Sequence, residues 1–311
     1  MIQFYKTLDN RVVPVEELSE GCWVNVTTPD KADIDFLTTE LGLERDFVLS
    51  SLDEEESSRI DSEEDQTLVI VDLPTAETLG EKTIQYSTMP MGIILTPQYV
   101  ITIAVRPHHV LTELSEGRIK NVTTHLRTRF LLSLLLRIAN RYLVYLKQID
   151  KISSLTEHQL HKSMKNKELI QLLGLEKSLV YFSTSLKGNE ITLEKILRGR
   201  IIKLYEEDQD ILEDVLIEIK QAIEMCNIYS SILSGTMDAF ASIISNNLNI
   251  VMKVLSSITI VMAIPTIVSS FYGMNVRGGM PLDNLWWFPV ALSAAISLVV
   301  ALILVKKDMF R

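Results

Sequence analysis

The stretch SSFYGMNVRGGMPLDNLWWFPV, residues 269–290, joins two long segments that carry no charged side chain. The first has 23 residues, between Lys253 and Arg277, and the second has 22, between Asp283 and Lys306. At 1.5 Å of rise per residue, each would form a helix of roughly 33–35 Å, enough to cross a hydrocarbon layer of about 30 Å. Two such segments in tandem predict a pair of membrane spans joined by a short turn.

The flanking residues predict how these spans are oriented. Trp286, Trp287 and Phe288 stand where the aromatic belt of a membrane protein is expected. Basic residues follow the second span at positions 306, 307 and 311, whereas the turn has a single base. The positive-inside bias then places both termini in the cytoplasm and the turn outside. The opening MIQFYKTLDNRVV has no apolar signal-peptide core, so we expect a multi-pass protein of the plasma or inner membrane whose bulk is cytoplasmic.

The charge of the chain limits the possible functions. It has 40 acidic and 30 basic residues, a net charge of −10, and only two of the acids follow residue 250. Such an acidic body argues against a nucleic-acid partner and is compatible with cations. The cysteines, Cys22 and Cys226, are far apart and suggest neither a disulfide framework nor a thiolate metal site. Because no nucleophile–base set and no phosphate-binding Gly-rich loop is visible, we expect neither an enzyme nor an organic cofactor.

Residues 1–118 are predicted to form a cytoplasmic α/β domain. Runs rich in β-branched residues at 22–29, 66–74, 83–95 and 99–105 predict strands. Residues 30–42 predict a helix that is capped by Asp30 and ends at Gly42. Residues 119–200 predict a cytoplasmic helical hairpin, in which the helix starting near 167 ends at Gly188 and Asn189 and a further helix begins near Ile191.

A long helix is predicted over 201–272, with its last part, about 251–272, as the first membrane span. Gly235 is a weak interruption, and Pro265 is a breaker that a membrane span tolerates as a kink. Residues 273–284 would form the outer loop, 285–305 the second span and 306–311 a basic cytoplasmic tail. The predicted fold class is an α+β cytoplasmic domain, a long helical stalk and two transmembrane helices.

Small and polar residues recur along this long helix at alternating steps of four and three. A period of 3.5 keeps one face turned toward a common axis. The face would either line a water-filled pore or pack helices closely together, and polar residues that continue toward the cytoplasm favour the pore. Two spans per chain cannot enclose a pore, so a symmetric ring of copies is required. The stripe comprises Asp238, Ser242, Ser245, Asn249, Met252, Ser256, Thr259, Ala263, Thr266 and Ser270.

Several motifs resemble the CorA family of magnesium channels. They are YGMN at the end of the first span, NIVMKVL at 249–255 and MPL at 280–282, and the clear resemblance covers about residues 200–311. It implies a funnel-shaped homopentamer whose outer selectivity filter is Gly273, Met274 and Asn275. It also implies a hydrophobic constriction at Met252 and Leu255, with a polar ring at Asn249 below it.

The resemblance implies passive uptake of Mg²⁺, with Co²⁺ and Ni²⁺ as further candidates, driven by the membrane potential. Mg²⁺ gives up its waters reluctantly, and neutral amide and carbonyl oxygens can accept hydrogen bonds from its hydration shell without stripping it. Here Leu282 stands where similar proteins usually carry Glu, which predicts weaker attraction of cations at the outer mouth.

Three carboxylates, Asp210, Asp214 and Glu218, share one face of the long helix at spacings of four. A solvated acidic face is the simplest interpretation. Asp214, however, aligns with the regulatory inter-subunit magnesium site of the family, which implies that cytoplasmic Mg²⁺ holds the ring closed. The family's usual acidic partners correspond to Ser50 and Ser51 here, and Asp53 with its neighbour Glu54 is a possible substitute.

Two other functions stay open. The same architecture could transport zinc, with or without proton coupling, or the chain could be a membrane-anchored coiled-coil scaffold that conducts nothing. His158 and His161 share one helical face, but without a third ligand a solvated pair is the simpler interpretation than a metal site.

Overall fold

The computed structural model describes residues 1–79, 83–119, 122–163, 166–199, 201–274, 282 and 285–309, with the side chains of 79, 83 and 161–163 also outside the description. The chain divides into two compact units, Met1–Gly235 and Thr236–Arg311. Each unit is described by itself below.

The first unit contains a seven-stranded sheet with strand order β2-β1-β3-β7-β6-β5-β4. All neighbouring strands are antiparallel except β3 and β7, which are parallel. The expected strands at 22–29, 66–74, 83–95 and 99–105 are confirmed, and three further strands, β1, β2 and β4, were not predicted. The strands are β1 (Ile2–Leu8), β2 (Arg11–Val15), β3 (Trp23–Thr27), β4 (Arg59–Glu63), β5 (Gln66–Leu79), β6 (Thr83–Leu95) and β7 (Val100–Ala104).

Helices cover both faces of this sheet. One face packs against α1 (Lys31–Thr39) and α2 (Arg45–Ser50), where Leu37 and Val48 are fully buried among strand residues such as Ile101. On the other face Trp23 of β3 lies 5.4 Å from the ring of Phe130 and donates a hydrogen bond to Thr102. Since alternate residues of each strand face opposite sides, β3 and β7 are buried on both faces, with the polar pair Asn25 and Thr102 on the same side as Trp23.

Local capping explains where the short helices begin. The predicted cap of α1 is confirmed, because the Asp30 side chain accepts from the N–H of Asp33 and the Asp33 side chain accepts from that of Asp30. Helix α3 (His109–Ser115) begins after His108, whose Nδ1 accepts from the N–H of Val110 at 3.2 Å.

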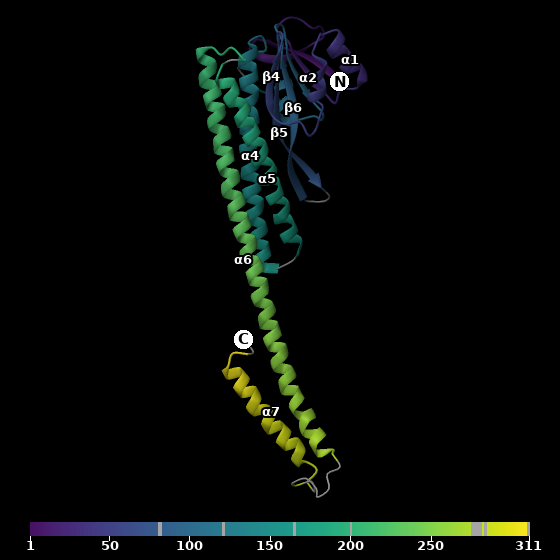
Figure 1. The fold of residues 1–311 in the computed structure, drawn as a ribbon, viewed down its shortest axis with the longest axis vertical. Helices are drawn as coiled ribbons and strands as arrows, with labels where there is room; N and C mark the ends of the chain where they lie inside the picture. The colour runs from purple at the N-terminus through teal and green to yellow at the C-terminus, as the bar shows by residue number, and fades with distance from the viewer. Residues whose placement is uncertain are drawn as a thin grey trace. The chain divides into compact units, whose positions relative to one another are not determined.

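Two long helices, α4 (Arg127–Ser163) and α5 (Asn166–Leu197), run side by side in the first unit (Figure 1). The predicted end of a helix at Gly188 and Asn189 is wrong, because α5 continues through both. A Cβ at Gly188 would lie 3.3 Å from Ser58, so the small residue allows a close approach there. Asn189 uses its side chain to bind the sheet rather than to end the helix. The chain turns instead at Gly199, whose φ is +65°.

Helix α6 spans Glu206–Tyr272, 67 residues or about 100 Å, and its start lies five residues beyond the expected position 201. Gly235 and Pro265 both lie inside it. In the second unit, α7 (Phe288–Lys306) follows α6. There α6 contacts both α7 and the residues after it: the rings of Tyr272 and Phe288 lie 6.2 Å apart, and the Ser257 hydroxyl donates to the carbonyl of Met309 at 3.3 Å. Helices α6 and α7 are both long and apolar enough to cross a membrane.

Candidate functional site

The predicted stripe lies on an exposed face of α6. In the single chain every one of its residues is exposed, and the two residues of the expected constriction, Met252 of the stripe and its neighbour Leu255, are 52% and 56% exposed. This exposure includes the polar residues at the N-terminal end of the stripe, as far as Asp238. The predicted pore-lining residues, all exposed, are Asp238, Ser242, Ser245, Asn249, Met252, Leu255, Ser256, Thr259, Ala263, Thr266 and Ser270.

Within the second unit, a different face of α6 is covered. Between Val254 and Tyr272, the residues of α6 that are buried or half-buried stand at 254, 257, 261, 264, 268 and 272. Stripe positions such as 259, 266 and 270 are two residues away from these, which corresponds to about 200° around a helix of 3.6 residues per turn. The contacts of Ser257 and Tyr272 with the segment 288–309 show that α7 lies on this covered face. The stripe therefore lies on the side of α6 away from α7.

Hydroxyl groups of the stripe bond to their own helix. Ser242 donates to the carbonyl of Asp238 at 3.0 Å, and Thr259 donates to that of Leu255 at 2.8 Å. This pairing uses the single hydroxyl proton of each side chain, and the oxygen keeps its capacity to accept. An exposed row of acceptor oxygens can receive hydrogen bonds from water around a cation.

The predicted filter lies where α6 ends. The N–H of Gly273 donates to the carbonyl of Ser269 at 2.9 Å, and that of Met274 donates to Phe271 at 3.3 Å. Met274 is 57% exposed. Asn275 lies outside the described residues, as do the neighbouring positions 276–281, so the structure describes only the first two residues of the filter.

The predicted regulatory carboxylates lie on an outer face of α6. Asp210 and Asp214 are exposed and Glu218 is half-buried, whereas Leu212 and Ile219 of the same helix are buried. Among the described residues of the single chain, no group of three or more His, Cys, Asp or Glu side chains converges as a metal site would require. Asp214 and Asp53 therefore do not form a complete site within one copy of this part of the chain.

Ser50 and Ser51, which the resemblance aligns with the family's acidic partners, differ in their surroundings. Ser51 is fully buried, and its hydroxyl donates to the carbonyl of Phe47 at 2.7 Å. A Cβ on Gly92 would lie only 1.8 Å from the Ser51 hydroxyl oxygen, so Ser51 fills the space that a side chain at position 92 would need. The neighbouring Ser50 accepts a hydrogen bond from Arg59. Asp53 is exposed, and its carboxylate accepts from the N–H of Glu55 at 2.9 Å.

A buried polar cluster was missed by the sequence analysis. Burial raises the pKa of Asp72, while hydrogen bonds with Ser185 and Ser58 oppose that rise. Tyr142 donates its hydroxyl to the Asp72 carbonyl at 3.0 Å, and burial raises the Tyr142 pKa well above its usual value. An aspartate in the apolar run LVIVDLP was the available signal for this cluster, since a buried carboxyl needs hydrogen-bond donors.

Within the described residues, no metal site forms around the histidine pair of α4. His158 is exposed on α4, and the side chain of His161 lies outside the description. His108 is a structural residue: its Nε2 lies 2.8 Å from the carbonyl of Pro74 and its Nδ1 caps α3.

Comparison with known proteins tests the resemblance. The model of the family described as CorA-like Mg²⁺ transporter protein matches residues 19–307. The chain is 27% identical to the cobalt/magnesium transport protein CorA of Methanocaldococcus jannaschii, over 89% of this chain and 87% of that one. It is 26% identical to the protein of the same name from Thermotoga maritima, over 97% of this chain and 86% of the relative.

The fold matches as well. The complete structure of the CorA magnesium transporter from Methanocaldococcus jannaschii aligns with a TM-score of 0.82 at 23% identity, covering 99% of this chain and 96% of that one. This likeness confirms the predicted order of an α+β domain, a long helix and two apolar helices. The match from residue 19 to residue 307 places the chain in the family of CorA-like Mg²⁺ transporters, which is a family of membrane transporters and not of enzymes.

Proposed function

We propose that copies of this chain assemble into a channel through which hydrated Mg²⁺ moves along the α6 stripe. The observation that carries the proposal is the position of α7, which covers the face of α6 opposite the stripe and leaves the row of acceptor oxygens exposed. The names of the two CorA relatives support magnesium and cobalt as cargo.

The proposed assembly is a homopentamer in the lipid bilayer. Each chain has two candidate spans, which are too few to enclose a pore, so equivalent α6 helices from several copies would surround it. In this arrangement α7 would face lipid, as its exposed Leu298 and Leu302 suggest. Residues 1–250 and the tail at 306–311 would lie in the cytoplasm, and the loop at 273–284 would lie outside.

The proposed filter selects by hydration. Carbonyl oxygens of Gly273 and side-chain amides of Asn275 would accept hydrogen bonds from water around Mg²⁺, which releases its waters reluctantly. A neutral ring binds the ion less tightly than carboxylates would, so the ion can leave again. No chemical energy source is needed, because a divalent cation gains about 4.6 kcal/mol per 100 mV on entering a negative cell interior.

Cytoplasmic Mg²⁺ would close this channel through the carboxylates of α6. Asp214, with Asp210 and Glu218 one turn away on either side, would meet acidic groups of the adjacent copy, among which Asp53 is a candidate. A divalent ion between copies would offset the repulsion among these carboxylates, and loss of the ion would favour separation and opening.

The test is divalent-ion flux into liposomes that contain the purified protein. Under an inward-negative potential, wild-type protein should admit Mg²⁺ and Co²⁺, and Asn275→Ala should lower the Mg²⁺ flux by about tenfold or more. Asn227→Ala, an exposed amide on α6 outside the stripe, is the matched control and should conduct normally. If Asn275→Ala leaves the flux unchanged, or if the wild-type protein admits no divalent ion, the scaffold function is favoured. If Zn²⁺ enters faster than Mg²⁺, the zinc transporter is favoured.

A further inference from the structure

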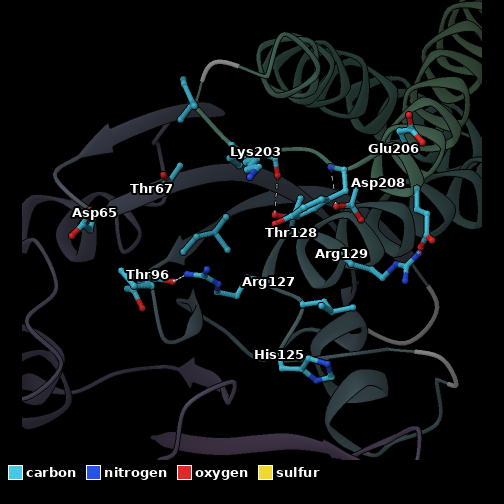
Figure 2. A pocket seen from close by; sticks show the side chains of 17 residues that line it. Asp65, Thr67, Thr96, His125, Arg127, Thr128, Arg129, Lys203, Glu206 and Asp208 are labelled. Atoms are coloured by element: carbon cyan, nitrogen blue, oxygen red, sulfur yellow. Dashed lines mark hydrogen bonds and ion pairs between the residues drawn. The ribbon is translucent and has the colours of Figure 1, made fainter.

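The first unit contains a cavity of about 900 Å³ that none of the residues assigned to conduction lines (Figure 2). It lies where β6 ends and where the chain enters both α4 and α6. Its size is in the range of small-molecule sites, about 300–1,000 Å³. The lining residues that matter here are Arg127, Lys203, Leu126, Ile201 and Tyr205.

Two cations of the lining lack a carboxylate partner. Arg129 pairs with Glu207 at 2.6 Å, but within the described part of the chain Arg127 and Lys203 form no ion pair. Arg127 donates to the carbonyl of Thr96, and the Lys203 ammonium lies 5.4 Å from the ring centre of Tyr205. The remaining donors of both side chains are available to a ligand.

The carboxylates of the lining do not neutralise these two cations. Asp208 is 5% exposed and accepts from the backbone N–H of Tyr205, so it serves the start of α6. Glu207 is paired with Arg129. In Figure 2, Asp65 and Glu206 lie at opposite edges of the view, whereas Lys203 and Arg127 lie in its middle. Arg127 and Lys203 are therefore the two cations of the lining that no described carboxylate pairs with.

The same cavity exposes apolar groups that a folded domain would normally cover. Leu126 is 43% exposed, Ile201 is 38% exposed and the side chain of Tyr205 is 62% exposed. Exposed apolar side chains gathered around a concave site are typical of ligand-binding surfaces. A Tyr ring also offers a flat surface on which another aromatic ring can stack.

We propose that this cavity binds a nucleoside phosphate. Arg127 and Lys203 would bind the phosphate oxygens through charge-assisted hydrogen bonds, and the base would pack against Tyr205 and the neighbouring aliphatic side chains. Neither an inorganic phosphate nor an uncharged nucleoside alone would use both parts of the lining. The site would give the cytoplasmic unit a second ligand that does not depend on the proposed conduction of Mg²⁺.

The experiment measures binding of the fluorescent nucleotide mant-ADP to the full-length protein in detergent, by anisotropy. EDTA is present, so that chelation of Mg²⁺ by the nucleotide does not enter the readout. We expect saturable binding that excess ADP displaces and that equal concentrations of pyrophosphate or adenosine displace at least about tenfold less effectively. Displacement by pyrophosphate as effective as by ADP, or by adenosine as effective as by ADP, would overturn the assignment to a nucleoside phosphate.

Variants identify the site. Lys203→Ala and Tyr205→Ala should each weaken mant-ADP binding by about tenfold or more, because one removes a phosphate partner and the other the stacking surface. Lys220→Ala, an exposed lysine of α6 outside the cavity, should bind as wild type does. The proposal would be refuted if Lys203→Ala bound mant-ADP with wild-type affinity, or if the wild-type protein showed no saturable binding up to about 1 mM nucleotide. Thermal melting curves check that each variant is folded.

Discussion

The side-chain amide of Asn189 forms two hydrogen bonds with the backbone of Asp72. Its Nδ2 donates to the Asp72 carbonyl at 3.0 Å, and its Oδ1 accepts from the Asp72 N–H at 2.9 Å. The Ser58 hydroxyl donates to the same Oδ1 at 2.9 Å. One amide thereby links α5 to β5 and to the segment before β4, and Asn189 is only 2% exposed.

We predict that Asn189→Ala destabilises the first unit by about 1–3 kcal/mol, because it leaves the Asp72 N–H without its partner and the Asp72 carbonyl with the Tyr142 hydroxyl as its remaining side-chain donor. The measurement is the free energy of unfolding from urea titration, followed by far-UV circular dichroism. Asn227→Ala removes an exposed amide of α6 and should change stability by less than about 0.5 kcal/mol. An equal loss in both variants would show that the hydrogen bonds of Asn189 contribute little.

The sequence predicted the buried strands and the two apolar helices well because their signals are local. Strands β3, β5, β6 and β7 are rich in β-branched residues. The strands at the sheet edges, β2 and β4, were missed because edge strands are often polar or interrupted: β2 contains Pro14, and β4 reads RIDSE.

Long-range contacts explain the remaining differences. Gly188 and Asn189 read as a helix end, yet Asn189 is held inside α5 by contacts with Asp72, more than 100 residues away. The burial of Ser51 against Gly92 was equally invisible, because nothing in the local sequence brings α2 to β6. For the candidate site, the 3.5-residue stripe could be predicted from spacing alone, whereas its position relative to α7 required the structure.

We predict that Gly92→Ala destabilises the protein by at least about 1–3 kcal/mol, because the new methyl group would lie 1.8 Å from the Ser51 hydroxyl oxygen. Ser51→Gly in the same chain removes that hydroxyl and its Cβ, so the double variant should recover part of the loss. Thermal unfolding of the four chains of this double-mutant cycle measures the coupling. Strictly additive effects would contradict a direct contact between the two residues.

Stability should also depend on His108. Burial lowers the pKa of His108, mainly by desolvation and against the opposing hydrogen bond to Pro74, so protons bind the unfolded chain more readily than the folded one. The contribution of neutral His108 is therefore complete above about pH 6.5 and is lost as the pH falls below that value.

His108→Asn tests this, because Asn can still accept from the N–H of Val110 at the start of α3 but does not titrate in this range. We expect the variant to be less stable at pH 7.5 and to lose less stability than wild type between pH 7 and pH 5. His109→Asn replaces an exposed neighbour and should keep the wild-type profile. Parallel profiles for wild type and His108→Asn would assign the acid sensitivity to other groups.

Asp214 provides a test of gating. If Mg²⁺ bridges copies at this carboxylate, Asp214→Ala should weaken the protection that millimolar Mg²⁺ gives against proteolysis and raise the Mg²⁺ flux at high internal Mg²⁺. Glu213→Ala removes an exposed carboxylate of the same charge on an adjoining face of α6 and serves as the control. Protection that is equal in wild type, Glu213→Ala and Asp214→Ala would remove Asp214 from the sensor.

Accessibility to thiol reagents can decide whether the α6 stripe lines water or packs against other helices. Ser256 is an exposed member of the stripe, whereas Ser257 is fully buried, with its hydroxyl donating to the carbonyls of Lys253 and Met309. The native thiols should give little background, because Cys22 is fully buried and burial raises the pKa of Cys226 to about 12, which keeps that thiol protonated.

We therefore predict that Ser256→Cys, in the assembled protein in liposomes, reacts with a permanently cationic methanethiosulfonate and loses Mg²⁺ flux as it does so. Ser257→Cys should not react, because α7 covers it. Native Ile258 is 48% exposed in the single chain, yet Ile258→Cys should also be inert, since lipid or a neighbouring copy would cover that face. A water-filled pore requires this difference between adjacent positions, and packing alone predicts that Ser256→Cys is as unreactive as Ser257→Cys.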